Sequence, residues 1–129
     1  MSNPTDPPGT TPTPNPTGLP YTPAVAAGGW VAVSGQLGLR DGALVADFAG
    51  EVDQVLVNLA DRLAGHGLGL GDVVKTTCFL ADLAQFAEFN ERYAAAFAEP
   101  RPARSAFQVA RLPFDANVEI EAWALARPT

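Results

Sequence analysis

Apolar positions along this chain follow two different spacings, which predict where strands and helices lie. Residues 30–37, residues 73–81 and two stretches after residue 101 are short β-branched and apolar runs, typical of buried or half-buried strands. Over residues 48–63 and about 83–98 the apolar residues recur at steps of three and four, typical of helices that bury one stripe. The chain is therefore expected to alternate strands with two amphipathic helices.

Turn and capping residues divide these runs from one another. Asp41-Gly42 between apolar flanks predicts a hairpin, and Asp47 suits the N-cap of the first helix. Gly65 and Gly67 follow the last apolar position of that helix and predict its end. The expected order is β-β-α-β-α-β-β, with both helices packed on one face of a single mixed sheet, which is an α+β fold.

Composition changes near residue 20 and predicts the domain boundary. Residues 1–19 hold six of the 12 prolines and no aromatic residue, so we expect a disordered Pro-rich tail. A proline-rich ligand for a partner domain is the functional alternative for this tail. With 47% hydrophobic residues overall, residues 20–129 are expected to form one domain with its own core.

Charge and cysteine content narrow the possible partners. The net charge is −6, and the Lys and Arg residues form no basic stripe, which argues against a nucleic-acid partner. No apolar run approaches the ~20 residues that a membrane-spanning helix requires. One cysteine cannot form an internal disulfide, and the chain starts without the pattern of a signal peptide, so a cytoplasmic protein is expected.

Few residues suit metal or nucleophilic chemistry. His66 and Cys78 are the only histidine and the only cysteine, and they share no ligand spacing, so no metal site and no Cys-His pair is expected. Cys78 falls within an apolar strand, and His66 is expected to place favourable charge at a helix C-terminus. Gly35 is unusual inside a buried strand and predicts a bulge or a close approach of other atoms.

Charged residues inside the last two strands raise the question of a binding site. By alternation Arg104 shares a sheet face with small residues such as Ala106, while Glu119 and Glu121 share a face of the other strand. A guanidinium beside small residues suits a carboxylate ligand, which it would hold by two parallel hydrogen bonds. A simple cross-strand Arg–Glu pair is the other interpretation, and the pattern alone leaves both open.

Three stretches resemble the RidA (YjgF/YER057c/UK114) family of reactive intermediate deaminases. They are "PYTPAVAAGGWVAVSGQLGL", "DVVKTTCFLADLAQFAEFNERYAAAF" and "PARSAFQVARLPFDANVEIEAWA", and the resemblance covers about residues 18–127. It implies a chorismate mutase-like α+β fold and a homotrimer with pockets at the subunit interfaces. It also implies hydrolysis of enamine and imine acids, such as 2-aminoacrylate with 2-iminopropanoate, and 2-iminobutanoate, to 2-oxo acids and ammonia without a cofactor.

The resemblance also implies roles for individual residues. Arg104 of "PARS" corresponds to the arginine that binds the substrate carboxylate, and Glu119 of "VEIEA" to the residue that orients the attacking water. Tyr21 corresponds to the aromatic residue that closes the pocket, and Ser34 and Asn90 to polar positions that shape it.

Two positions depart from the family pattern. Ala106 stands where the pattern commonly reads "PARSC", which removes a cysteine beside the substrate and enlarges the pocket, and Phe114 stands where a basic or small residue is common. A hydrolase dedicated to a larger imine, favoured by Ala106, is one alternative function. A non-catalytic trimer that binds a 2-oxo acid through Arg104 is another, whereas the acidic charge argues against ribonuclease activity.

Overall fold

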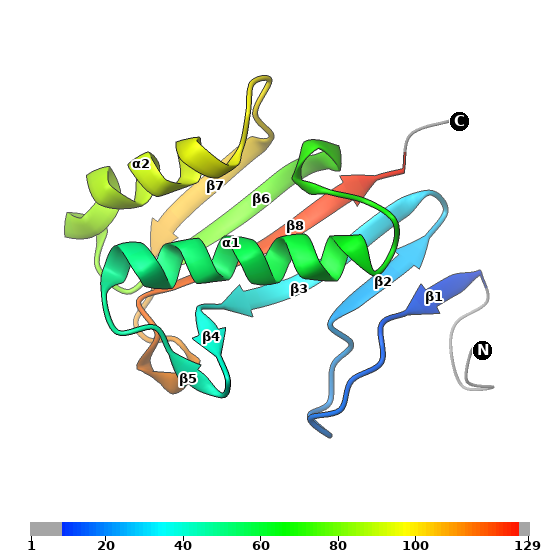
Figure 1. The fold of residues 1–129 in the computed structure, drawn as a ribbon, viewed down its shortest axis with the longest axis horizontal. Coiled ribbons are helices and arrows are strands. Elements are labelled where there is room, and N and C mark those ends of the chain that lie inside the picture. The colour runs from blue at the N-terminus through cyan, green and yellow to red at the C-terminus, as the bar shows by residue number, and fades with distance from the viewer. Residues whose placement is uncertain (1–8, 127–129) are drawn as a thin grey trace.

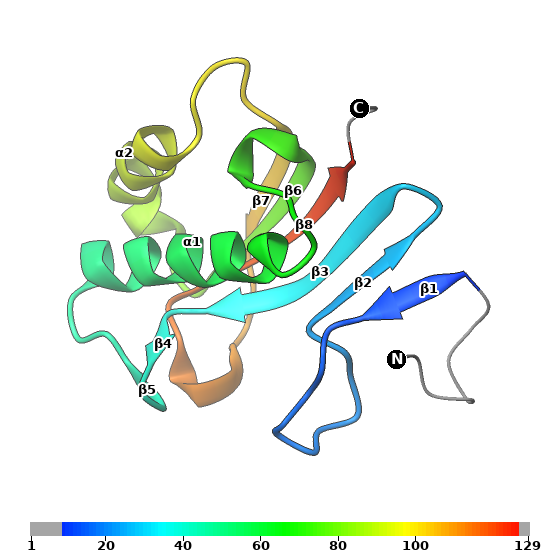
Figure 2. The same cartoon turned by 45° about the vertical axis from the view of Figure 1, so that its right-hand side comes forward.

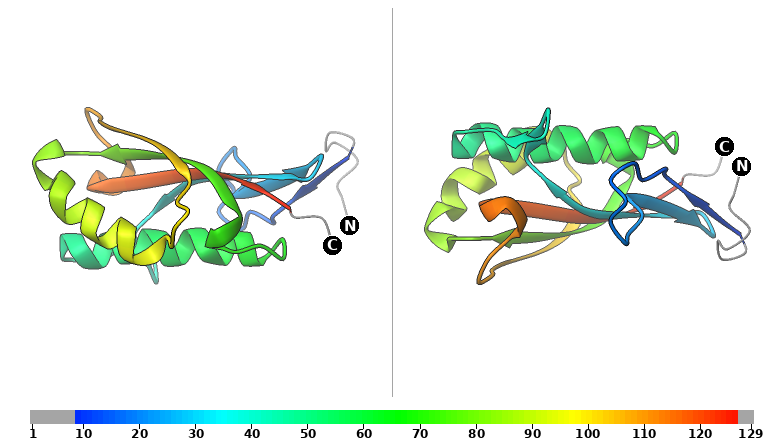
Figure 3. Two further views of the ribbon diagram at one scale, coloured as in Figure 1. Left: turned by 90° about the horizontal axis from the view of Figure 1, so that it is seen from above. Right: turned by 90° about the horizontal axis from the view of Figure 1, so that it is seen from below.

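The computed structural model describes residues 9–126, and a six-stranded mixed sheet with two helices on one of its faces forms the body of this part of the chain (Figure 1). Only the β6–β7 pair is parallel among the pairs of this sheet. Both helices lie on the same side of the sheet when it is seen edge-on, as Figure 3 shows. The expected α+β architecture is confirmed. The strands, in sheet order, are β1 (Thr10–Pro12), β2 (Ala24–Ala27), β3 (Trp30–Leu37), β8 (Val118–Leu125), β6 (Val73–Leu80) and β7 (Ala103–Gln108).

Local signals in the sequence place the hairpin and the first helix correctly. β4 (Leu39–Arg40) and β5 (Ala43–Leu44) pair across Asp41-Gly42, and both turn residues have positive φ. α1 (Phe48–Ala64) begins at Asp47, whose carboxylate accepts a hydrogen bond from the Gly50 amide at 2.9 Å. The buried stripe of α1 packs on the sheet and forms one side of the core.

The second helix is shorter than expected. α2 (Phe86–Ala96) follows a 3-10 turn (Leu83–Gln85), and the spacing of apolar residues does not distinguish such a turn from an α-helix. Further 3-10 turns in the described part of the chain span Leu70–Asp72 and Pro113–Asp115. Phe89, Tyr93 and Phe97 point from this segment into the core, as the spacing predicts. Within residues 9–126, neither helix combines the length and the apolar character that crossing a membrane requires.

The expected tail over residues 1–19 is wrong for its second half, while residues 1–8 lie outside the described part of the chain. Thr10–Pro12 add a strand to β2 (Figure 2). The Thr13 hydroxyl lies 2.9 Å from the His66 ring just after α1. Edge strands are held by backbone hydrogen bonds and tolerate proline, so this pairing needs little apolar surface. The low apolar content of residues 10–12 therefore does not reveal this strand.

The last two strands do not pair with each other. β8 lies between β3 and β6, whereas β7 pairs with β6 at the far edge of the sheet. The two strands are therefore not the neighbours that a cross-strand Arg–Glu pair would require. Strand order depends on contacts between distant segments, which the local pattern does not encode.

Candidate functional site

Arg104 lies on the edge strand β7 and its side chain reaches the helix-covered side of the sheet. The guanidinium carbon is 4.9 Å from the ring centroid of Tyr93, 5.4 Å from that of Phe86 and 5.8 Å from that of Phe89. Its Nη1 donates to Oδ1 of Asn90 on α2 at 2.8 Å, which leaves Nε and Nη2 without a hydrogen-bond partner in residues 9–126. The structure thus brings Arg104 and Asn90 together, with donors free for an anion.

A buried polar pair supports the rings beneath Arg104. The Tyr93 hydroxyl lies 2.7 Å from Oγ1 of Thr76, and both side chains are buried. Burial raises the pKa of Tyr93. The Tyr93 ring is therefore a fixed, neutral surface for the guanidinium.

Ala106 pairs with Cys78 of β6 in the parallel register. Burial raises the pKa of the Cys78 thiol to about 11, so the thiol is protonated at neutral pH. Cys78 is inside the core, as expected, and is unsuited to act as a nucleophile.

Glu119 lies on the opposite face of the sheet. Its strand neighbours Val118 and Ile120 are buried towards the helices, while Glu119 and Glu121 share the other face, as alternation predicts. Burial, and then the nearby Glu121 carboxylate, raise the pKa of Glu119. We therefore expect the Glu119 carboxyl to take up a proton more readily than an exposed glutamate does.

Gly35 makes room for the Glu119 carboxyl group. A Cβ at residue 35 would lie 2.7 Å from Cδ of Glu119, a distance that real Cβ atoms do not adopt. The β3–β8 register also shifts between Val33 and Gln36, so the expected bulge and close approach are both present.

Arg104 and Glu119 do not meet within one chain. They occupy opposite faces, and β6 separates their strands, so the two strands are about 10 Å apart at the usual spacing. The cross-strand ion pair left open by the sequence is therefore wrong for this structure. One chain therefore does not present both side chains to a single ligand.

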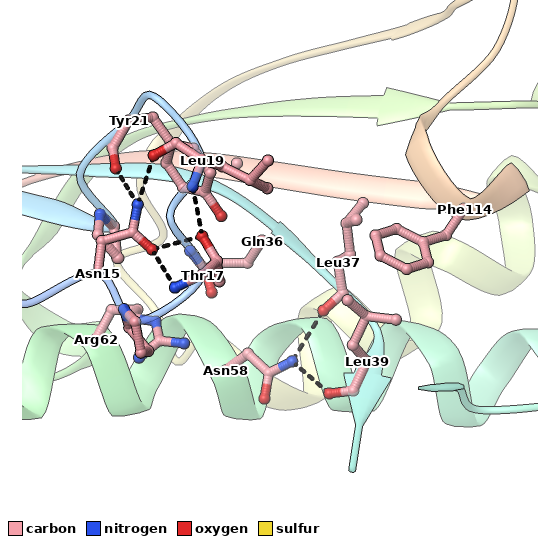
Figure 4. A pocket seen from close by; sticks show the side chains of 13 residues that line it. Asn15, Thr17, Leu19, Tyr21, Gln36, Leu37, Leu39, Asn58, Arg62 and Phe114 are labelled. Carbon is pink, nitrogen blue, oxygen red and sulfur yellow. Dashed lines mark hydrogen bonds between the residues drawn. The ribbon is translucent and has the colours of Figure 1, made fainter. Parts of the chain in front are cut away.

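Tyr21 and Ser34 lie far from Arg104 in the sheet, near the point where β2 begins beside the second half of β3. The Ser34 hydroxyl donates to the Thr22 carbonyl at 2.6 Å. Tyr21 lines a hollow of about 320 Å³ between the loop before β2, the end of β3, and α1 (Figure 4). Further lining residues are Asn15, Pro16, Thr17, Leu19, Pro23, Gly35, Gln36, Leu37, Leu39, Asn58, Arg62 and Phe114.

The loop that walls this hollow is ordered by its own side chains. Asn15 donates to the carbonyls of Leu19 and Tyr21, and its Oδ1 accepts from the amide and hydroxyl of Thr17. These contacts are typical of Asn and Thr in tight turns. Residues 15–19 fall within the tail that the Pro-rich composition predicts, so this wall was not expected, although "NPTG" is a recognisable turn signal.

A buried carboxylate that the sequence gives no reason to single out fixes the start of β8. Glu51 of α1 is 1% exposed, and its two oxygens accept from the backbone amide and the side-chain amide of Asn117 at 2.7 and 2.8 Å. The Asn117 carbonyl accepts from the Ala81 amide. Glu51 therefore positions the segment that leads into Glu119.

Comparisons with known proteins relate this chain to one protein family by sequence and by structure. A family model described as Endoribonuclease L-PSP matches residues 11–126. Reactive Intermediate Deaminase A from Arabidopsis thaliana is 46% identical over 105 residues, covering 79% of this chain, which spans only 56% of that protein's length. The 2-iminobutanoate/2-iminopropanoate deaminase of Salmonella typhimurium is 42% identical over 84% of this chain and 88% of its own. Among solved structures, E. coli TdcF with bound serine has a TM-score of 0.82 and 38% identity, covering 84% of this chain and 90% of its own.

Proposed function

This chain belongs to the RidA/YjgF family, and we propose that it hydrolyses reactive enamine and imine acids to 2-oxo acids and ammonia. The proposed substrates are 2-aminoacrylate with its imine 2-iminopropanoate, and 2-iminobutanoate, as the names of the relatives suggest. The observation that carries the proposal is the Arg104 guanidinium, which is held against α2 with two donor groups free to bind a carboxylate.

In the proposed reaction the substrate carboxylate binds Arg104 and water adds to the carbon of the C=N bond. Glu119 orients that water and accepts one of its protons, which then passes to the nitrogen. The new hydroxyl group gives up its remaining proton to the nitrogen as the C=O bond forms, the C–N bond breaks and ammonia leaves. The raised pKa of Glu119 makes the carboxylate a better base than an exposed one. An imine carbon is already electrophilic, so positioning and a water suffice, and the proposal includes no metal or organic cofactor.

We propose that the site is shared between neighbouring copies in a homotrimer. The opposite placement of Arg104 and Glu119 supports this, because one chain does not offer both to one ligand. The face of the sheet away from the helices also carries Trp123 and Phe107, which are 48% and 44% exposed. Large apolar side chains on an uncovered sheet face support an interface between subunits.

We propose supporting roles beside Arg104 and Glu119 for the remaining predicted site residues. Asn90 holds the guanidinium of Arg104 in position, and Ala106 leaves space on the same strand. Tyr21 and Ser34 contribute from the Glu119 side, next to the hollow.

We propose a small-molecule substrate, although the family model is described as an endoribonuclease. The net charge of −6 provides no basic stripe for a phosphate backbone. We also propose a cytoplasmic location, which the buried free thiol of Cys78 supports because such thiols persist in reducing compartments. No membrane partner is proposed.

Complementation between two variants tests both the reaction and the shared site. 2-Iminobutanoate is generated in situ by an amino acid oxidase and its loss is followed, with Arg104→Ala and Glu119→Gln assayed separately and after co-expression. Wild type accelerates hydrolysis and each variant alone loses at least tenfold, because an Arg–carboxylate contact contributes about 1.5–3 kcal/mol. If the two variants mix randomly in a ring, roughly a quarter of the interfaces combine an intact Arg104 from one copy with an intact Glu119 from its neighbour. Co-expression is therefore expected to restore roughly a quarter of the sites.

Three results would count against this proposal in different ways. No acceleration by wild type refutes the deaminase assignment, and binding of 2-oxobutanoate through Arg104 without turnover then favours the regulatory trimer. Activity of both variants alone refutes the assigned roles. If the two inactive variants form trimers by sedimentation but do not restore activity when co-expressed, the shared site is refuted. Arg40→Ala on the exposed β4–β5 hairpin serves as the matched control.

A further inference from the structure

The hollow beside Tyr21 has features of a substrate pocket that the proposed reaction does not use. Its volume of about 320 Å³ lies at the lower end of the range of small-molecule sites, which is about 300–1,000 Å³. Gly35 and Leu37 line it, and Glu119 lies over Gly35 and opposite Leu37 in the strand register. The hollow therefore adjoins the carboxylate to which the attacking water is assigned.

Polar side chains around the hollow are mostly occupied by the protein itself. Asn58 donates to the carbonyls of Leu37 and Leu39, Gln36 donates to the Ser34 carbonyl, and Asn15 binds its own loop. These donors are not free for a ligand. The hollow thus presents mainly apolar surface, and its composition favours an apolar group.

Phe114 is held over the hollow at a cost. Its φ is +63° and that of Asp115 is +54°, a left-handed conformation that bulky residues rarely adopt. Arg111 Nε donates to Asp115 Oδ1 at 2.7 Å across this turn. Figure 4 shows the Phe114 ring lying towards Leu37, and both residues line the hollow.

The ring gains little from the protein in this position, because the Phe114 side chain remains 65% exposed. An exposed phenyl ring in a strained backbone conformation is poorly explained by packing. A ligand that covers the ring would explain it.

Resting on the proposed deaminase function, we propose that this hollow binds the side chain of the substrate and that Phe114 forms its apolar wall. The chain then prefers 2-imino acids with branched or aromatic side chains over 2-iminobutanoate. Each additional buried methylene group is expected to raise kcat/KM about fourfold. The imine of leucine carries two more carbons than 2-iminobutanoate and is expected to be preferred about tenfold or more.

The experiment compares kcat/KM for 2-iminobutanoate, the leucine imine and 2-iminoglutarate in the full chain, each generated by an oxidase or dehydrogenase. Wild type is expected to prefer the leucine imine about tenfold, and Phe114→Ala to reduce that preference to about twofold. Val57→Ala, on the part of α1 away from the hollow, is the matched control and keeps the wild-type ratio. Phe114→Gly is expected to lose the preference while unfolding at the same or a higher temperature, because glycine adopts positive φ without strain.

Several outcomes would overturn this assignment without touching the deaminase function. Hydrolysis of 2-iminobutanoate by wild type without any preference for the leucine imine refutes the pocket. A Phe114→Gly variant that is much less stable than wild type means that Phe114 has a structural role. A preference for 2-iminoglutarate that Arg62→Gln abolishes means that the exposed Arg62 recognises a second carboxylate and that the ligand is acidic. Loss of hydrolysis of every imine by wild type instead refutes the deaminase function itself.

Discussion

Removing the Glu51 carboxylate is expected to destabilise the protein strongly. The group is buried, and it accepts two hydrogen bonds from Asn117 at 2.7 and 2.8 Å. A hydrogen bond to a charged group contributes about 1.5–3 kcal/mol, so the loss of both in Glu51→Ala costs about 3–6 kcal/mol of unfolding free energy. Against a typical total of about 5–15 kcal/mol, this lowers the unfolding midpoint by about 10–20 °C.

Matched variants separate the charge from the packing. Glu51→Gln keeps the shape and one acceptor and is expected to cost about 1–2 kcal/mol, while Glu91→Gln on the exposed side of α2 stays within about 0.5 kcal/mol of wild type. Unfolding is followed by circular dichroism in urea at one fixed protein concentration, because assembly shifts apparent stability. A Glu51→Gln variant as stable as wild type would refute the reasoning, since the two hydrogen bonds would then not compensate the burial of charge.

Two further predictions concern the titratable groups. Burial, and then the nearby Glu121 carboxylate, raise the pKa of Glu119, so the acid limb of kcat/KM is expected at higher pH than for an ordinary glutamate. Glu121→Gln removes the second cause and is expected to move this limb to lower pH, and an unmoved limb would argue against Glu119 as the base. Cys78, with a pKa of about 11 and no exposed surface, is expected to resist a thiol reagent at pH 8 until urea unfolds the chain, and rapid labelling of the native protein would contradict its burial.

Local chemistry accounts for what the sequence predicted well. The hairpin at Asp41-Gly42, the start of α1 at Asp47 and the shared face of Glu119 and Glu121 each depend on residues within a few positions of one another. The alternation that places Arg104 and Ala106 on one face of β7 is equally local.

Features that depend on distant segments were not predictable in the same way. β8 lies between β3 and β6, so β6 separates the strand of Glu119 from that of Arg104, and no spacing in the sequence records this order. The β1 strand depends on backbone pairing with β2, which a Pro-rich composition conceals. The hollow combines a turn, a strand end and a helix, so it emerges only once those three elements are placed.

Because Gly35 has no side chain, the residue at position 35 determines where the carboxyl group of Glu119 can lie. An added methyl group there would overlap the carboxyl of Glu119, so Gly35→Ala moves a charge without changing its chemistry. Substitutions at the two positions are therefore not independent, and their effects on any property of Glu119 are not additive. A mutational library that varies position 35 alone yields variants in which the Glu119 carboxylate is displaced. A library that varies positions 35 and 119 together can also yield pairs of side chains that fit beside each other.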